Sequence, residues 1–261
     1  MFILMPVLCA ILSAVSPAAA LDGFAPDNDV PPVRAQRAEA RPDDCGLSGV
    51  TVFSEEPESV APACSGFARA ASFMRERGYT SLKPLTIRVA ARFPEHYYQA
   101  VNPDGSPMYD MDNMYGFYES DTAEVFMKTY AQFAKLPADR MLYGIAPSRE
   151  LYASYVAHEA AHHISILGYK GAGKIPRVQT EFISYAAQMD TMEPGLRGEV
   201  LKLFSADGGR PFPGEDSISE MQYGFDPQGF TVKSWLFLKD PAGTDTMDKI
   251  MTGRLSEPTG F

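Results

Sequence analysis

The sequence SRELYASYVAHEAAHHISILG, residues 148–168, decides how the second half of this chain folds. Ser148 is a favourable N-cap for a helix, and Gly168 is a favourable place for that helix to stop. The residues between them have the composition of a continuous helix. The stretch therefore predicts one long helix, and the polar side chains along it can be placed relative to one another.

Three of these polar side chains have the spacing of a metal site. His158 and His162 lie four residues apart, so they share one face of the helix, with Cβ atoms about 5 to 6 Å apart. Two imidazoles in this arrangement can bind one zinc ion. Glu159 lies between them, where its carboxylate can accept a proton from a water molecule on the metal.

A catalytic zinc site needs a third protein ligand and one open position. Glu181 lies in PRVQTEFISYAAQMD, residues 176–190, where Pro176 suits the first turn of a helix. Apolar residues recur there at helical spacing, at Val178, Phe182, Ile183 and Ala186. We therefore expect Glu181 to project from a second helix toward the first and to complete the set of ligands.

Histidine is scarce in this chain, which favours a metal site over an incidental pattern. Of four histidines, three lie between positions 158 and 163. The alternatives are a helix face with solvated or core histidines, and a zinc site without catalysis. His163 lies about 100° around the helix from His162, so we expect it to support the site or to lie at the surface. We expect His96, which follows a strand, to be a surface residue.

With Glu181 following after eighteen residues, the pattern His158-Glu159-x-x-His162 resembles the zincin metallopeptidases whose third zinc ligand is a glutamate, the gluzincins. The resemblance implies that His158, His162 and Glu181 bind Zn²⁺ and that Glu159 is the general base. The zincin branch whose third zinc ligand is a histidine shortly after the motif is excluded, because no histidine follows there, and the exopeptidase signature of the aminopeptidase relatives is absent. The closest description is a short, exported, bacterial-type member with an unknown substrate.

The resemblance covers about residues 120–190 and also implies a zincin-like fold. Such a fold has a sheet upstream of the metal-binding helix, and an edge strand of that sheet binds an extended substrate. The segment TAEVFMKTY, residues 122–130, is our candidate for that strand. Relatives stabilise the developing oxyanion with a tyrosine or histidine after the glutamate ligand.

Tyr185 and Tyr223 are the tyrosines that follow Glu181 in this chain. Tyr185 lies one turn beyond Glu181, where packing beside the ligand is the expected role. Tyr223 is therefore the candidate for stabilising the oxyanion. Tyr155 shares a face with the paired histidines, and core packing explains it as well as a hydrogen bond near the site does.

Strand-like segments precede the helices along the chain. GVTVFS and PLTIRVAARF have strand patterns, CSGFARAASFMRERG has helical spacing with a stop at Gly78, and NPDGSPMYDMDNMYGFYES is rich in turn residues. After Ser148, helix follows helix to the end, including the apolar segment that holds Trp235 and Phe237. This order predicts an α+β fold, with a small mixed sheet N-terminal to a helical half.

The first residues have the character of a signal peptide. Residues 1–20 contain no charged side chain and end in three alanines, so we expect cleavage after Ala20; a membrane anchor is the alternative, but the apolar run is short and holds Pro6. Residues 21–44 predict a flexible leader, rich in Pro, Asp and Ala. A single metallopeptidase domain would then occupy residues 45–261.

Cysteine usage and charge limit the location and the partners. Cys45 and Cys64 remain after signal cleavage, and an even pair in an exported chain predicts a disulfide. The formal net charge is −10 and no basic cluster is present, which argues against a nucleic-acid partner. We therefore expect an exported, periplasmic or secreted zinc-dependent peptidase that acts on a peptide or protein and has no membrane span after cleavage. The alternative is a non-catalytic zinc-binding envelope or interaction protein of the same fold.

Overall fold

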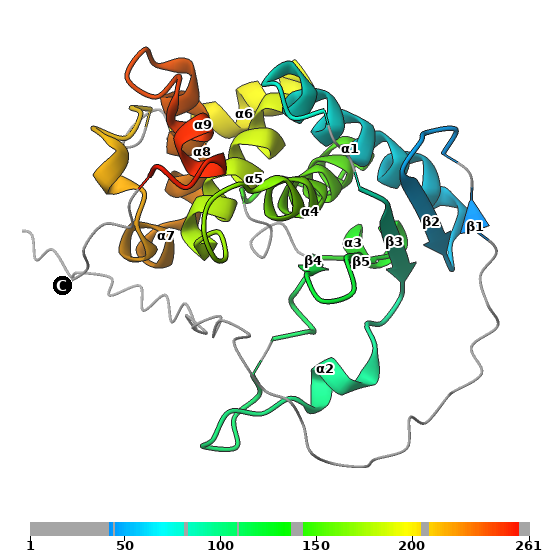
Figure 1. Cartoon of the computed structure of the whole chain (residues 1–261). Helices are drawn as coiled ribbons and strands as arrows, with labels where there is room; N and C mark the ends of the chain where they lie inside the picture. Colours follow the sequence, from blue (N-terminus) through cyan, green and yellow to red (C-terminus); the bar gives the residue numbers. More distant parts are fainter. Residues whose placement is uncertain are drawn as a thin grey trace, which may run out of the picture.

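A small mixed sheet precedes a larger helical half in the chain (Figure 1). The computed structural model describes residues 42–43, 45–80, 83–108, 110–136, 143–204 and 209–255. The strands are β1 (Pro42–Asp43), β2 (Val50–Ser54), β3 (Leu85–Ala90), β4 (Gly116–Glu119) and β5 (Glu124–Lys128). The predicted α+β class is confirmed at this level. The predicted signal peptide, and the leader except Pro42 and Asp43, lie outside the described residues.

The strand order in the sheet is β1-β2-β3-β5-β4, which differs from the order in the chain. β2, β3 and β5 are parallel, whereas β4 runs antiparallel to β5 and forms an edge. The prediction that residues 122–130 supply the edge strand is therefore wrong, because β5 pairs on both sides. The edge strand Gly116–Glu119 lies inside the segment that we expected to consist of turns.

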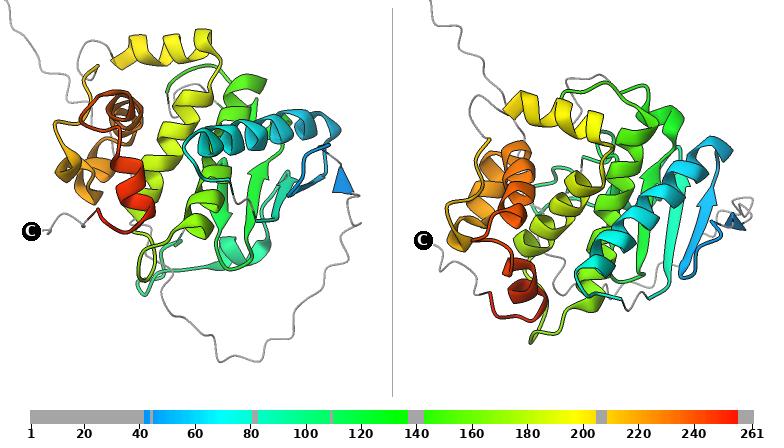
Figure 2. Two further views of the ribbon diagram at one scale, coloured as in Figure 1. Left: turned by 45° about the horizontal axis from the view of Figure 1, so that its top comes forward. Right: turned by 90° about the horizontal axis from the view of Figure 1, so that it is seen from above.

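Two helices cover one face of this sheet, α1 (Pro57–Glu76) and α4 (Arg149–Gly168), and α5 (Arg177–Thr191) packs beside them. In Figure 2, α1 and α4 lie across the strands, and α5 continues the layer beyond the edge formed by β4. Alternate residues of the strands, such as Val52, Ile87 and Val125, are fully buried. They pack with the helices into one continuous apolar core.

The C-terminal helices lie on the side of α5 away from β2 (Figure 2). The helical elements there are α6 (Pro194–Phe204), the 3-10 turn η2 (Glu215–Ser217), α7 (Glu220–Phe225), α8 (Pro227–Lys239) and α9 (Thr246–Met251), and α8 packs directly against α5. The prediction of further helices in this third of the chain is confirmed. Phe237 is buried as expected, whereas Trp235 is only partly buried and its indole N–H donates to Asp190.

The other face of the sheet holds a small aromatic cluster. Phe126 of β5 stacks on Phe117 of β4, and Phe93 packs edge-on against Phe117. The short helices α2 (Glu95–Gln99) and α3 (Tyr130–Phe133) flank β4 and β5 in the chain. Through Tyr97, α2 covers this cluster. The edge strand β4 is therefore packed on both faces while its outer side stays unpaired by any described strand.

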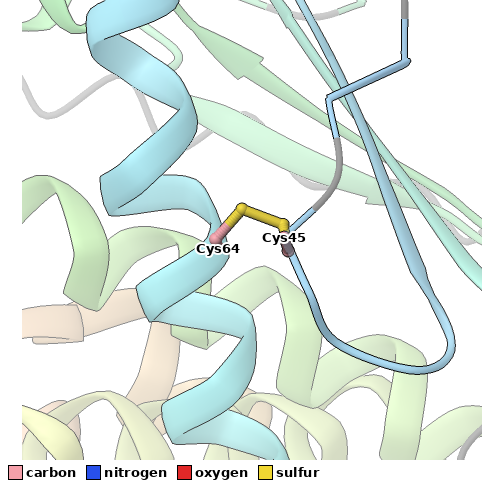
Figure 3. Close-up of a disulfide and its surroundings, with 2 residues drawn as sticks. All are labelled: Cys45 and Cys64. Atoms are coloured by element: carbon pink, nitrogen blue, oxygen red, sulfur yellow. A yellow bond between two sulfur atoms is a disulfide. The ribbon is translucent and has the colours of Figure 1, made fainter.

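Cys45 and Cys64 form the predicted disulfide (Figure 3). The Cα atoms are 5.5 Å apart, and the bond ties the segment before β2 to the middle of α1. Disulfides persist in oxidising compartments, so this bond is compatible with an exported protein. Within the described residues, no helix is both long and apolar enough to cross a bilayer.

Candidate metal centre

The helix α4 carries the two histidines much as the sequence predicts. The hydroxyl of Ser148 accepts a hydrogen bond from the N–H of Leu151 at 3.0 Å, and this N-cap sets where the helix begins. Gly168 is the last helical residue rather than the first residue beyond the helix. The Nε2 atoms of His158 and His162 lie 3.1 Å apart, and both side chains are buried.

The second helix, α5, brings Glu181 to these imidazoles. Its Oε2 atom lies 3.5 Å from Nε2 of His158 and 3.7 Å from Nε2 of His162. Residues 169–176 form the loop that joins the two helices, with Pro176 immediately before the first turn of α5. Because α4 and α5 pack along each other, two imidazoles from one helix and one carboxylate from the next meet at a single point.

The carboxylate of Glu181 is buried beside two imidazoles, but the distances to them are too long for normal hydrogen bonds. Among the described residues, its buried Oε2 atom has no hydrogen-bond partner, because both imidazole distances exceed the normal range. Burial alone would raise the pKa of Glu181, but attraction to the imidazoles of His162 and His158 outweighs burial and holds the pKa well below its ordinary value. The carboxylate therefore stays ionised beside two nitrogen donors.

Glu159 lies at the same point but is less enclosed than the histidines. One donor atom each from His158, Glu159 and His162 lie within 4.8 Å of one another, so this buried cluster could hold a metal ion. Burial raises the pKa of Glu159, although the neighbouring imidazoles oppose the shift. The backbone N–H of Tyr118 in the edge strand β4 also lies close enough to the Glu159 carboxylate to oppose the rise in its pKa slightly.

Both tyrosines singled out in the sequence lie near the site. The ring of Tyr185 is 4.4 Å from that of His158 and 6.1 Å from that of Tyr223, between ring centroids. The carboxylate of Glu181, followed by burial, raises the pKa of Tyr223, so that phenol stays protonated close to the ligand. Tyr155 is buried among aromatic rings of the core.

The helix α7, which carries Tyr223, is held by an ion pair that the sequence did not reveal. The guanidinium of Arg177 donates to Glu220, and it also lies over the ring of Tyr223, 5.1 Å from the centroid. Arg177 precedes Glu181 by one helical turn. Arg177 and Glu220 have opposite charges, but they lie 43 positions apart, so the sequence alone does not indicate that they pair.

The two other histidines lie outside the candidate metal site. His96 is exposed, as expected. His163 is not at the surface: it is 1% exposed and contacts Tyr118 and Lys83.

Comparison with known proteins identifies a family without an assigned activity. A model described as "Family of unknown function (DUF6639)" matches residues 50–258, a span that includes every residue of the metal centre. No curated protein and no solved structure matches the chain.

Proposed function

The chain belongs to the DUF6639 family, and from the geometry of its site we propose that it is a zinc-dependent metallopeptidase of gluzincin type. Its zinc ligands are His158, His162 and Glu181. Two imidazoles and one carboxylate form the ligand set of several catalytic zinc sites, and they leave one coordination position for water or substrate.

The spacing of the three donor atoms is the observation that supports this proposal. At zinc–ligand distances of about 2.0 to 2.2 Å, tetrahedral donors lie about 3.4 Å from one another. The three separations here are 3.1, 3.5 and 3.7 Å. One ion can therefore reach all three donors with little movement, and it would satisfy the Oε2 atom of Glu181, which has no hydrogen-bond partner among the described residues.

Bound zinc polarises a carbonyl group and lowers the pKa of water. Glu159 is the general base: its carboxylate removes a proton from the attacking water and returns it to the amine that leaves. Tyr223 keeps its proton beside Glu181 and donates a hydrogen bond to the oxygen on which negative charge develops. These roles account for Glu159 and Tyr223 beside the three proposed ligands.

The edge strand β4 is the proposed binding surface for an extended peptide. It lies beside Glu159, because the N–H of Tyr118 approaches that carboxylate closely enough to influence its pKa. A peptide added to an unpaired edge gains main-chain hydrogen bonds without regard to its sequence. The substrate is therefore a peptide or protein in an extended conformation.

Metal content tests the ligand set. We expect about one zinc per chain from elemental analysis of the purified protein, with loss of zinc in His162→Ala and in Glu181→Ala. His96→Ala is the matched control, since this exposed histidine is remote from the cluster. A wild-type protein that binds no zinc after exposure to the metal would refute the proposal.

Hydrolysis of a fluorogenic peptide library tests catalysis. Glu159→Gln should retain zinc and lower the rate by about 10²- to 10⁴-fold, the usual contribution of a general base. Glu150→Gln is the control on the same helix, because that carboxylate pairs with Arg69 instead. Zinc binding with no hydrolysis in either protein would favour the non-catalytic alternative.

Export is part of the proposal. Cleavage after Ala20 would release a chain that starts at Leu21, and the disulfide between Cys45 and Cys64 supports an oxidising destination. N-terminal sequencing of the protein from a periplasmic or culture fraction tests this, and an intact residue 1–20 segment in the cytoplasmic fraction would contradict it.

A further inference from the structure

His163 uses both of its ring nitrogens away from the metal cluster. Its Nε2 atom lies 3.0 Å from the carbonyl oxygen of Lys83, and its Nδ1 atom lies 3.3 Å from the hydroxyl of Tyr118. A carbonyl oxygen can only accept a hydrogen bond, so Nε2 carries the proton and donates a hydrogen bond to the Lys83 carbonyl oxygen. The lone pair of Nδ1 then accepts from Tyr118. Neither nitrogen is left for a metal ion.

Tyr118 is well suited to be the donor in this contact. Burial, and then the charge of Glu119, raise the pKa of Tyr118 to about 12, so its hydroxyl keeps its proton. The two rings also meet edge to face, with centroids 5.5 Å apart. The contact therefore combines a hydrogen bond with aromatic packing inside the protein.

The main chain of Tyr118 faces away from the sheet. The N–H of Lys128 donates to the carbonyl of Tyr115, and hydrogen-bonded pairs alternate along an antiparallel ladder. Phe117 therefore bonds to β5, whereas the N–H and C=O of Gly116 and Tyr118 point to the open edge. The Tyr118 N–H meets the carboxylate of Glu159 at that edge.

Glu159 and His163 lie four residues apart, on one face of α4. Tyr118 consequently faces this helix at two points: its N–H lies near Glu159, and its hydroxyl bonds to His163. We propose that His163 is a positioning residue that clamps the edge strand β4 to α4 through Tyr118. The clamp holds the strand beside Glu159, where an extended peptide would bind.

The catalytic consequence rests on the proposed function, whereas the clamp itself does not. It predicts that β4 stays ordered beside α4 in the protein with or without zinc. It also predicts that removal of the imidazole frees the strand first and lowers turnover through Glu159, with no loss of metal ligands.

Amide hydrogen exchange of the full chain measures the clamp without any need for activity. Tyr118→Phe removes the hydroxyl alone, and His163→Phe removes both hydrogen bonds of the imidazole. We expect the amides of residues 116–119 to exchange about tenfold faster in both variants, since one hydrogen bond is lost at the strand. Peptides from β2 and α8 should exchange as in the wild type. Tyr79→Phe, which removes a phenol bonded to Asp248, is the matched control and should leave β4 unchanged.

A conservative variant separates hydrogen bonding from simple packing. His163→Asn places an amide oxygen near the position of Nδ1, where it can accept from Tyr118. We expect it to restore β4 exchange to within about threefold of the wild type. Equal exchange in the wild type and His163→Phe, or equal acceleration in His163→Asn and His163→Phe, would overturn the proposal. Where His163→Phe loosens the whole fold, exchange in Tyr118→Phe decides the question.

A double-variant comparison tests the link to catalysis. His163→Phe should keep its zinc and lower kcat/KM about tenfold. If His163 acts through Glu159, adding His163→Phe to Glu159→Gln should slow the reaction no further. Additive losses would show that His163 acts elsewhere. An inactive or zinc-free wild type would refute the proposed function while leaving the exchange result to judge the clamp.

Discussion

The contact between α1 and α4 depends on the absence of a side chain at Gly66. A Cβ atom built there would lie 2.5 Å from the carbonyl oxygen of Ala153 and 2.6 Å from Cβ of Val156. The first distance falls about 0.9 Å short of ordinary contact. Because the obstacle is the backbone of the helix that carries the metal cluster, rotation of a side chain cannot relieve it.

Gly66→Ala should therefore destabilise the protein even though alanine is the better helix former. Overpacking a close contact costs about 1 to 3 kcal/mol, and a backbone obstacle belongs at the upper end. Helix propensity returns about 1 kcal/mol, which leaves a net loss of about 1 to 2 kcal/mol. Gly198→Ala in α6 is the matched control, because a Cβ there meets nothing within 4 Å. It should stabilise the protein by about 0.5 to 1 kcal/mol.

Urea unfolding followed by the fluorescence of Trp235, the single tryptophan, measures both variants. We expect the midpoints to move in opposite directions with little change in the m-value, since the fold is kept. A Gly66→Ala protein as stable as Gly198→Ala would refute the argument that α1 and α4 need this glycine.

Three other predictions concern the supports around the centre. Removal of the disulfide as the Cys45→Ala, Cys64→Ala double variant should cost about 3 kcal/mol, the closure entropy of its loop, with zinc content unchanged; a loss below about 1 kcal/mol would contradict it. Burial alone would raise the pKa of Asp190, but its ammonium and indole partners outweigh burial and hold the pKa below the ordinary value of about 3.9. The ionised carboxylate therefore stabilises the fold fully above that value, and this stabilisation is lost as the pH falls through the folded pKa. Asp190→Asn should cost about 2 kcal/mol of unfolding free energy at pH 7 and flatten the acid side of the plot of stability against pH. An unchanged acid side would contradict this. Arg177→Gln should lower stability by less than about 1 kcal/mol but lower peptide turnover about tenfold, and Glu220→Gln should do the same. A loss of turnover no larger than the loss of stability explains would contradict a positioning role for this ion pair.

The sequence predicts those parts of the site that depend on local signals. Ser148 caps α4, the i, i+4 spacing turns His158 and His162 to one face, and apolar periodicity gives the helix that carries Glu181. Each of these follows from residues within a few turns of one another. The α+β order of elements is likewise visible as a change of period along the chain.

The edge strand escaped prediction because its signals are weak and its partners are distant. β4 has only four residues, each partly buried, and it begins with a glycine in a segment rich in turn residues. It pairs with β5, whose other neighbour is the distant strand β3, so no alternation in the sequence shows which strand forms the edge. Helical spacing indicates α1 only from Cys64 onward, because Pro62 lies inside the first turns of that helix.

The burial of His163 could not be predicted from the sequence for the same reason. Its partners Tyr118 and Lys83 are 45 and 80 positions away, so nothing near His163 in the sequence distinguishes a buried imidazole from a surface one. The adjacent histidines thus have separate tasks: His162 turns toward Glu181, and His163 turns toward the strand. A metal-binding motif alone gives the ligands and the base. How β4 is held beside the proposed base depends on tertiary contacts. If the proposed function holds, substitutions that spare every proposed ligand should therefore still weaken catalysis through this strand.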